Sequence, residues 1–238
     1  MTDMPLKDCV ALVTGASRGI GAATAIALAG LGAHPVIVAR TQGGLEETDD
    51  AIRTAGGTAT LLPLDLRDGD KVDLLGPSIY RRFGRLDILV HCAGELGQLT
   101  PAGHILPKDW ADVVGVNLAA AWRLIRSADP LLRQSDAGRA VFVTDKVARE
   151  PAAYWGALGA TKAGMENLVR AWAAETTQTK LRINLFDPGV VRSRMRAAAF
   201  PGENPATLPG PETVSGALAA LCLPTEVRHG ALIEANAR

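Results

Sequence analysis

Short apolar runs rich in valine, isoleucine and leucine recur along the chain and alternate with longer segments rich in alanine and leucine. Uninterrupted apolar runs of this length are typical of strands buried on both faces of a parallel sheet. They predict strands at residues 9–14, 34–39, 58–64, 85–91, 139–144, 181–186 and 230–235. The longer segments predict helices at about residues 19–31, 44–55, 70–83, 108–128, 155–176 and 211–222.

This alternation of strand and helix predicts an α/β fold, a doubly wound parallel sheet of about seven strands with helices on both faces. No shift in composition marks a linker, so we expect residues 1–238 to form a single domain. The pattern weakens at residues 192–211, where prolines and glycines interrupt any long helix. We expect that segment to be a substrate loop or lid.

Composition limits the classes of partner. The 238 residues are 47% hydrophobic, and 25 basic residues balance 25 acidic ones, so no charge excess favours nucleic acid or a membrane surface. The N-terminal stretch predicts neither a signal peptide nor a membrane span, which favours the cytoplasm. Cys9, Cys92 and Cys222 are far apart and lack metal-ligand spacing, so we expect free thiols and no metal. The expected ligand is a small molecule.

The first predicted strand runs directly into TGASRGIGAA, residues 14–23, which opens the first predicted helix. Gly15, Gly19 and Gly21 let the backbone turn tightly and approach a pyrophosphate, whose charge suits the free N–H groups of a helix N-terminus. Because the motif lies between a strand and a helix, it predicts a dinucleotide-binding Rossmann fold.

The end of the second strand indicates which dinucleotide is bound. An acidic residue there would bind the ribose 2′-hydroxyl of NAD, whereas an arginine accommodates a 2′-phosphate. This strand ends in Arg40, and Arg18 adds a second positive charge from the glycine turn. The two arginines favour NADP over NAD. Asp65, after the third strand, is either a hydrogen-bond acceptor for adenine or the cap of a turn.

These residues together resemble the short-chain dehydrogenase/reductase family over nearly the whole chain. The matching motifs are its TGxxxGxG turn, its adenine-contacting pair, the end of its NNAG stretch, its active-site asparagine and lysine, and the PG segment beside the nicotinamide. The resemblance implies cofactor contacts from Gly15, Ser17, Arg18, Gly19, Ile20, Gly21, Arg40, Asp65, Leu66, Ala93, Gly94, Lys162, Pro188, Gly189, Val191 and Ser193. It also implies a homodimer or homotetramer, associated through the helices at 108–128 and 155–176.

The chain departs from the family at the residues that move the proton. The family tyrosine, four residues before Lys162, is replaced by Leu158, and the serine position holds Asp145, or Lys146 if the loop is one residue shorter. His91 and Cys92 replace the two asparagines of NNAG. Reduction of a carbonyl requires a proton for the alkoxide, which a tyrosine supplies when a nearby ammonium lowers its pKa. Leucine has no proton to exchange.

Other residues are candidates for the missing role. Tyr154 lies four positions before Leu158, and if one helix covers both they share a face, although its hydroxyl should point away from Lys162. Asp145 could donate a proton as a buried acid, or pair with Lys162 across the vacated site. The resemblance places Asn117 at a backbone irregularity that connects Lys162 to solvent; its alternative role is a buried amide satisfied by the backbone.

Two functions remain open from the sequence. The first is an NADP-dependent oxidoreductase of unknown carbonyl or alcohol substrate, in which Tyr154, Asp145 or water completes an atypical proton transfer. The second is a pseudoenzyme that keeps the nucleotide site and acts as a sensor, scaffold or partner subunit. Asn117 and Lys162 support the cofactor site in both cases, whereas Leu158 and Asp145 favour impaired chemistry.

Overall fold

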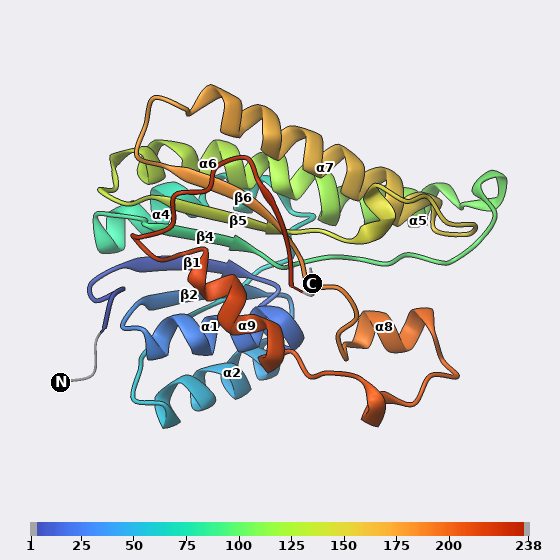
Figure 1. The fold of residues 1–238 in the computed structure, drawn as a ribbon, viewed down its shortest axis with the longest axis horizontal. Coiled ribbons are helices and arrows are strands. Elements are labelled where there is room, and N and C mark those ends of the chain that lie inside the picture. The colour runs from blue at the N-terminus through green and yellow to red at the C-terminus, as the bar shows by residue number, and fades with distance from the viewer. Residues whose placement is uncertain (1–3, 236–238) are drawn as a thin grey trace.

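The predicted strands are present and pair in one parallel sheet, in a computed structural model that describes residues 4–235. Their order across the sheet is β3-β2-β1-β4-β5-β6-β7 (Figure 1). They are β1 (Val10–Thr14), β2 (His34–Ala39), β3 (Thr60–Pro63), β4 (Ile88–His91), β5 (Arg139–Val143), β6 (Arg182–Asp187) and β7 (Leu232–Glu234). The α/β prediction is therefore confirmed, and each strand lies within three residues of its expected bounds.

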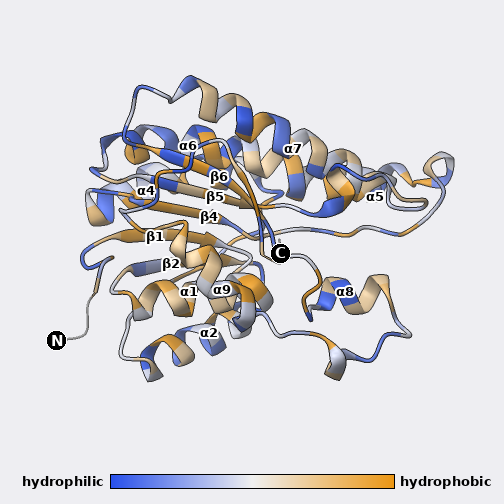
Figure 2. Cartoon of the chain, in the orientation of Figure 1, coloured by the Kyte–Doolittle hydropathy of each residue, from blue (hydrophilic) through white to orange (hydrophobic). Residues whose placement is uncertain are grey.

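Helices cover both faces of this sheet (Figure 1). One face is covered by α1 (Gly19–Gly30), α2 (Gln42–Thr54) and α9 (Glu212–Ala220), and the other by α3 (Gly69–Asp73), α4 (Leu75–Phe83), α6 (Ala120–Gln134) and α7 (Gly156–Glu175). Side chains alternate between the two cores along a strand, so Leu12 packs in one and Val13 in the other. Figure 2 shows the apolar strands enclosed between the helices.

Two of the predicted helices are divided. The expected helix at 70–83 breaks at Leu74 into α3 and α4, because Pro77 cannot donate to the carbonyl of Asp73. The Ser127 hydroxyl donates to that carbonyl instead, at 3.2 Å. The helix expected at 108–128 consists of α5 (Pro107–Val114), a π-helical turn (Gly115–Ala119) and α6, which extends to Gln134.

Residues 192–211 contain one short helix that the sequence pattern did not predict. Helix α8 (Arg194–Ala199) begins where the Ser193 hydroxyl accepts a hydrogen bond from the Arg196 amide at 3.0 Å. A single turn of 3₁₀ helix, Pro205–Thr207, follows it. No long helix forms in this segment, in agreement with its prolines and glycines.

All seven strands run in the same direction, so their carboxyl ends meet at one edge of the sheet. The strand order reverses between β1 and β4, and in doubly wound sheets ligands bind in the crevice at such a point. The glycine turn and the residues after β4, β5 and β6 gather at that edge. Within residues 4–235, no helix combines the length and hydropathy that a membrane crossing requires.

Candidate functional site

The glycine turn after β1 is built from close backbone contacts. Gly15 has a φ of 68°, and a Cβ added there would lie 2.7 Å from the amide nitrogen of Ala93. A Cβ on Gly21 would lie 2.3 Å from the carbonyl oxygen of Gly15. Gly19 has a φ of 58° but no atom within 4 Å of an added Cβ, so open space lies beside it. Larger side chains would therefore disturb the turn at Gly15 and Gly21.

The N-terminus of α1 beside this open space suits a phosphate group. Arg18 precedes the helix in an extended conformation and its side chain makes no capping hydrogen bond. The first turn of α1 contains no acidic residue. Free N–H groups and the positive end of the helix dipole are thus available, which is the arrangement that holds a dinucleotide pyrophosphate. Ser17 and Ile20 lie in the same turn and are half-buried.

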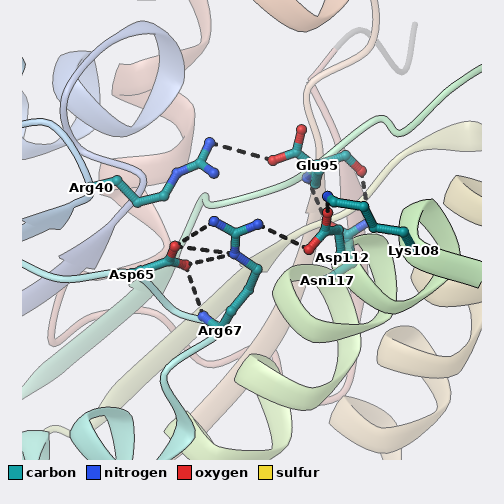
Figure 3. Close-up of polar contacts among 7 residues, drawn as sticks. All are labelled: Arg40, Asp65, Arg67, Glu95, Lys108, Asp112 and Asn117. Carbon is teal, nitrogen blue, oxygen red and sulfur yellow. Dashed lines mark hydrogen bonds and ion pairs between the residues drawn. The ribbon is translucent and has the colours of Figure 1, made fainter.

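The two arginines expected to recognise NADP lie at the adjacent corner. Arg18 and Arg40 are exposed, and a depression of about 400 Å³ is lined by Ser17, Arg18, Thr41, Gly44 and Glu47. A guanidinium nitrogen of Arg40 lies 3.4 Å from the Glu95 carboxylate (Figure 3). Both side chains of this pair are more than a third exposed, so the contact is weak and leaves Arg40 available to a ligand.

Asp65 is engaged by Arg67, a residue to which the sequence drew no attention. The Arg67 guanidinium lies 2.6 Å from the Asp65 carboxylate, and the Arg67 amide donates to the same carboxylate at 3.0 Å. These hydrogen bonds lower the pKa of Asp65. Arg67 also binds Asp112 of α5 at 2.9 Å (Figure 3). The structure therefore has the turn cap that the sequence left as one alternative for Asp65.

Asn117 lies in the π-helical turn and is completely buried. Its side chain accepts a hydrogen bond from the Glu95 amide at 2.8 Å and donates to the Glu95 carbonyl at 2.9 Å (Figure 3). It also donates to the Thr161 hydroxyl at 3.1 Å. The backbone is irregular at Asn117, and its buried amide is satisfied by the backbone of Glu95, which is the alternative role expected from the sequence. The asparagine fixes the loop that follows Gly94.

Lys162 is 5% exposed, and its ammonium donates to the Val143 carbonyl at 2.7 Å. Burial lowers the pKa of Lys162 to about 8, and the nearby Asp145 carboxylate opposes that shift. A Cβ added to Gly94 would lie 3.9 Å from the Lys162 Nζ atom, so the lysine reaches the crevice after β4. Nζ therefore lies at the ligand edge of the sheet, beside Gly94.

The direct ion pair expected between Asp145 and Lys162 is wrong. Within residues 4–235, Asp145 makes no ion pair shorter than 4.0 Å, and its Oδ1 accepts a hydrogen bond from the Val147 amide at 2.9 Å. The carboxylate caps the short 3₁₀ turn Lys146–Ala148, because the free N–H groups of that turn lie closer to it. Asp145 still acts on Lys162 through space, as the opposing effect on its pKa indicates.

The structure also overturns the shared helix face of Tyr154 and Leu158. Helix α7 begins at Gly156, and Tyr154 lies before it in a left-handed turn with a φ of 73°. Its side chain is 59% exposed, whereas Leu158 is 1% exposed and lies one helical turn before Lys162. Tyr154 is therefore poorly placed to replace the family tyrosine.

His91 and Cys92 are uncharged groups at the end of β4. His91 Nδ1 lies 2.8 Å from the Thr14 hydroxyl, while Nε2 is buried without a hydrogen-bond partner in the described part of the chain. Burial, reinforced by Lys162, lowers the pKa of His91 to about 3. Burial raises the pKa of Cys92 to about 12, so neither residue brings a charge or a thiolate to the site at neutral pH.

An ion-pair network that sequence analysis missed joins three elements beside Lys162. The Arg149 guanidinium pairs with Glu166 of α7 and with Asp187 at the end of β6. Asp187 also accepts a hydrogen bond from the Gly189 amide at 3.0 Å, and Thr144 donates to Glu166 at 2.7 Å. The three charged residues are far apart in the sequence with no motif spacing, so only the fold brings them together.

Residues 192–211 lie over the same edge of the sheet. The Met195 methyl group would be 3.3 Å from a Cβ added to Gly94, and the Phe200 and Trp155 rings are 5.8 Å apart. Arg196 binds Glu203 within the segment at 2.7 Å. The preceding turn holds the predicted cofactor contacts Pro188, Gly189, Val191 and Ser193, of which Pro188 and Val191 are buried.

Within residues 4–235, no three histidine, cysteine or acidic side chains cluster at ligand distance. The three cysteines are free thiols. The remaining predicted positions, Leu66, Ala93 and Gly94, follow β3 and β4 at the ligand edge of the sheet. The arrangement combines a phosphate cradle, a buried lysine and a carboxylate around one crevice.

Comparisons with known proteins agree with this geometry. Residues 9–204 match the family model described as short chain dehydrogenase. The oxidoreductase YciK of Escherichia coli is 36% identical over 212 residues, which is 88% of this chain and 84% of the relative. A short chain dehydrogenase of Shigella flexneri complexed with NADP has a TM-score of 0.93 and 34% identity, covering 98% of this chain and 99% of that one. A short chain dehydrogenase of Escherichia coli CFT073 complexed with NADPH also has a TM-score of 0.93 and 34% identity, covering 99% of this chain and 100% of that one. The chain belongs to the short-chain dehydrogenase family.

Proposed function

We propose that this protein binds NADP(H) and catalyses hydride transfer on a carbonyl or alcohol substrate, with an atypical route for the proton. The glycine turn and the uncapped N-terminus of α1 suit the pyrophosphate, and Arg18 and Arg40 suit the 2′-phosphate. Two similar structures are complexes with NADP and NADPH. These features favour NADP(H) over NAD(H).

The position of Lys162 is the observation that carries the proposal. Its ammonium is held by the Val143 carbonyl beside Gly94, where it can bind the nicotinamide ribose. When bound, NADP(H) supplies or accepts a hydride at nicotinamide C4. The Arg149 network orients the segment from Asp187 to Gly189 along the same edge. The protein thus keeps the groups that bind and orient the cofactor.

Asp145 is the proposed group for the proton. Its Oδ1 atom is engaged by the Val147 amide, while Oδ2 makes no hydrogen bond to any residue from 4 to 235. The side chain is half-buried at the end of β5, so it is accessible from the crevice. Tyr154 is a weaker candidate because it is exposed and lies outside α7. Asp145 therefore handles the proton directly or through water.

A nucleotide-binding pseudoenzyme is the second candidate. The apolar side chain of Leu158 is 1% exposed at the position of the family tyrosine, which favours loss of the proton donor. In that case NADP(H) would bind without turnover, and the protein would act as a sensor, scaffold or partner subunit.

A paired titration with NADPH and NADH, followed by assays of aldehydes, ketones and quinones, separates the two candidates. We expect NADPH to bind more tightly, and Leu158→Tyr to raise carbonyl reduction by about 100-fold or more because it restores a general acid beside Lys162. NADPH binding with turnover only in Leu158→Tyr would favour the pseudoenzyme. Turnover by the wild type that Asp145→Asn abolishes would favour the atypical enzyme.

We further propose that residues 192–211 act as a substrate lid, supported by the contacts of Met195 and Phe200 described above. Family membership supports a homodimer or homotetramer, and we propose a place in the cytoplasm. Tryptic protection of the segment by bound NADPH would test the lid.

A further inference from the structure

Two coupled substitutions change what the site can accept. The position of the family serine holds the Asp145 carboxylate, and that of the family tyrosine holds Leu158. We propose that the preferred hydride acceptor of this protein is a cationic C=N group, a protonated imine or an N-alkyl iminium ion, rather than a neutral carbonyl. This inference rests on the proposed NADP(H)-dependent hydride transfer; it replaces the carbonyl substrate by a cationic C=N group and makes Asp145 the group that binds this cation instead of the group that moves a proton.

Reduction of a neutral carbonyl requires a proton, whereas reduction of an iminium ion does not. A neutral carbonyl that gains a hydride becomes an alkoxide, which then needs a proton to become the alcohol. An iminium carbon gains the hydride from the dihydronicotinamide, the π electrons of the C=N bond become a nitrogen lone pair, and the products are a neutral amine and NADP⁺. No proton is taken up, so a site without a tyrosine is sufficient.

The negative charge of Asp145 also favours a cationic substrate. A carboxylate beside a developing oxyanion repels it, whereas beside an iminium ion it stabilises the bound cation. The free Oδ2 atom of Asp145 is the group available for this contact, since Oδ1 is engaged by the Val147 amide. A carboxylate binds a protonated imine or an organic ammonium group by a charge-assisted hydrogen bond, and it attracts an N-alkyl iminium ion, which has no N–H, by charge alone.

Most other charges near Asp145 are already neutralised within the protein. The Arg149 guanidinium donates to the Asp145 backbone carbonyl at 3.5 Å and pairs with Glu166 and Asp187. Arg196 of α8 pairs with Glu203 through two contacts of 2.7 Å. Within residues 4–235, neither Asp145 nor Lys162 has an ion-pair partner within 4.0 Å, although the Arg196 guanidinium is near enough to respond to the charge of Asp145.

Lys162 is compatible with a cationic substrate. Its ammonium is fixed by the Val143 carbonyl and is not drawn into a direct pair with Asp145. Burial lowers its pKa to about 8, so the neutral amine is accessible when a second cation enters. The Trp155 ring, 5.8 Å from Phe200, offers a weakly polar surface beside the lid, while the Phe200 ring already stacks with the Arg196 guanidinium at 3.8 Å.

The decisive experiment compares matched cationic and neutral ligands with wild type, Asp145→Asn and Glu150→Gln. Asparagine keeps an oxygen for the Val147 amide, so the turn should remain folded. Glu150 is an exposed acid five residues further on, paired with Lys146, and its substitution removes the same charge from the same loop. The substrates are N-methyl-3,4-dihydroisoquinolinium, whose charge is permanent, and the neutral ketone 2-tetralone. The binding probes are N-methylpiperidinium and cyclohexanol, titrated by calorimetry in the presence of NADP⁺.

We expect wild type and Glu150→Gln to reduce the iminium ion at least about tenfold faster than the ketone, and to bind the piperidinium more tightly than the alcohol. Asp145→Asn should lose at least about tenfold in both measurements while its NADPH affinity and melting temperature stay unchanged. Equal binding of the piperidinium by Asp145→Asn and wild type, or preference for the ketone, would overturn the inference alone. Absence of NADPH binding by the wild type would overturn the proposed function and this inference with it.

Discussion

The His91 side chain is buried at a site where a positive charge would be unfavourable. The imidazole is completely buried between Thr14 and the Phe142 ring, whose centroid is 5.4 Å away, and lies near the Lys162 charge. A protonated imidazole there would lack both hydration and a counterion. The residue therefore stays neutral in the folded protein over the whole physiological range. The same burial keeps Cys92 a thiol.

This residue should make the protein sensitive to mild acid. In the unfolded chain His91 takes up a proton near pH 6.5, whereas its pKa in the folded protein is about 3. The unfolded state binds more protons between those values, so stability present above pH 6.5 is lost as the pH falls towards 3. Asparagine can keep a hydrogen bond to Thr14 without titrating. Between pH 7 and pH 5, we expect the free energy of unfolding of wild type to fall by about 2 kcal/mol more than that of His91→Asn.

Urea denaturation of both proteins at the two pH values measures this difference. The Lys162 pKa of about 8 lies above that window, so its titration does not contribute there. Parallel loss of stability in wild type and His91→Asn would contradict the buried neutral histidine.

At the scale of elements, Arg149 holds the end of β5, helix α7 and the end of β6 together. Its nearest acidic partners, Glu166 and Asp187, have side chains only 3% and 7% exposed, whereas the exposed Glu234 lies 3.7 Å away; Glu166 has a second partner in Arg170. A buried carboxylate that loses its cation carries a large desolvation penalty, so removal of Arg149 should displace Asp187. The turn after Asp187 is the segment proposed to contact the nicotinamide half of the cofactor.

Arg149→Met should therefore affect one half of the cofactor site. We expect its affinity for NADPH to fall by at least about tenfold, and its affinity for adenosine 2′,5′-bisphosphate, which lacks the nicotinamide half, to stay close to that of wild type. Arg170→Met is the matched control, since it removes the exposed partner of Glu166 and leaves Asp187 paired. Fluorescence titration gives both affinities. Equal weakening of the two ligands would mean that Arg149 acts only on general stability.

At the scale of the whole molecule, α5, the residue before it and the first turn of α6 carry exposed apolar side chains. Leu106, Trp110 and Trp122 are 58%, 43% and 42% exposed, and Trp122 is flanked by the guanidinium groups of Arg123 and Arg126. Large exposed aromatic residues of this kind are enriched in interfaces between subunits. This face is the one that the family resemblance expects to be shared between two copies.

Trp110→Glu should weaken such an assembly. We expect wild type to sediment as a dimer or tetramer and Trp110→Glu to sediment with a lower mass, because a charge would be buried in the interface. Tyr80→Glu, which alters an equally exposed aromatic residue on α4, should keep the wild-type mass. Sedimentation velocity over a range of concentrations distinguishes these cases. A monomeric wild type would refute the proposed assembly.

The helix predictions were less exact than the strand predictions for a local reason. Apolar runs identify buried strands directly, because both faces of each strand are covered. The breaks at Leu74 and at the π-helical turn depend on single backbone hydrogen bonds, to which a pattern of hydropathy is insensitive. Helix α8 is short and proline-flanked, so its six residues left no periodic signal.

The sequence by itself determined the sheet, the dinucleotide turn and the identity of the residues at the centre of the site, because glycine spacing, apolar runs and the YxxxK departure are local patterns. Only the tertiary structure decided which of these residues meet. It separated Tyr154 from Leu158 by starting α7 at Gly156, and it turned Asp145 towards the Val147 amide. It also joined Arg149 to Glu166 and Asp187. Contacts between residues distant in the chain depend on how strands and helices pack, and no local pattern encodes them.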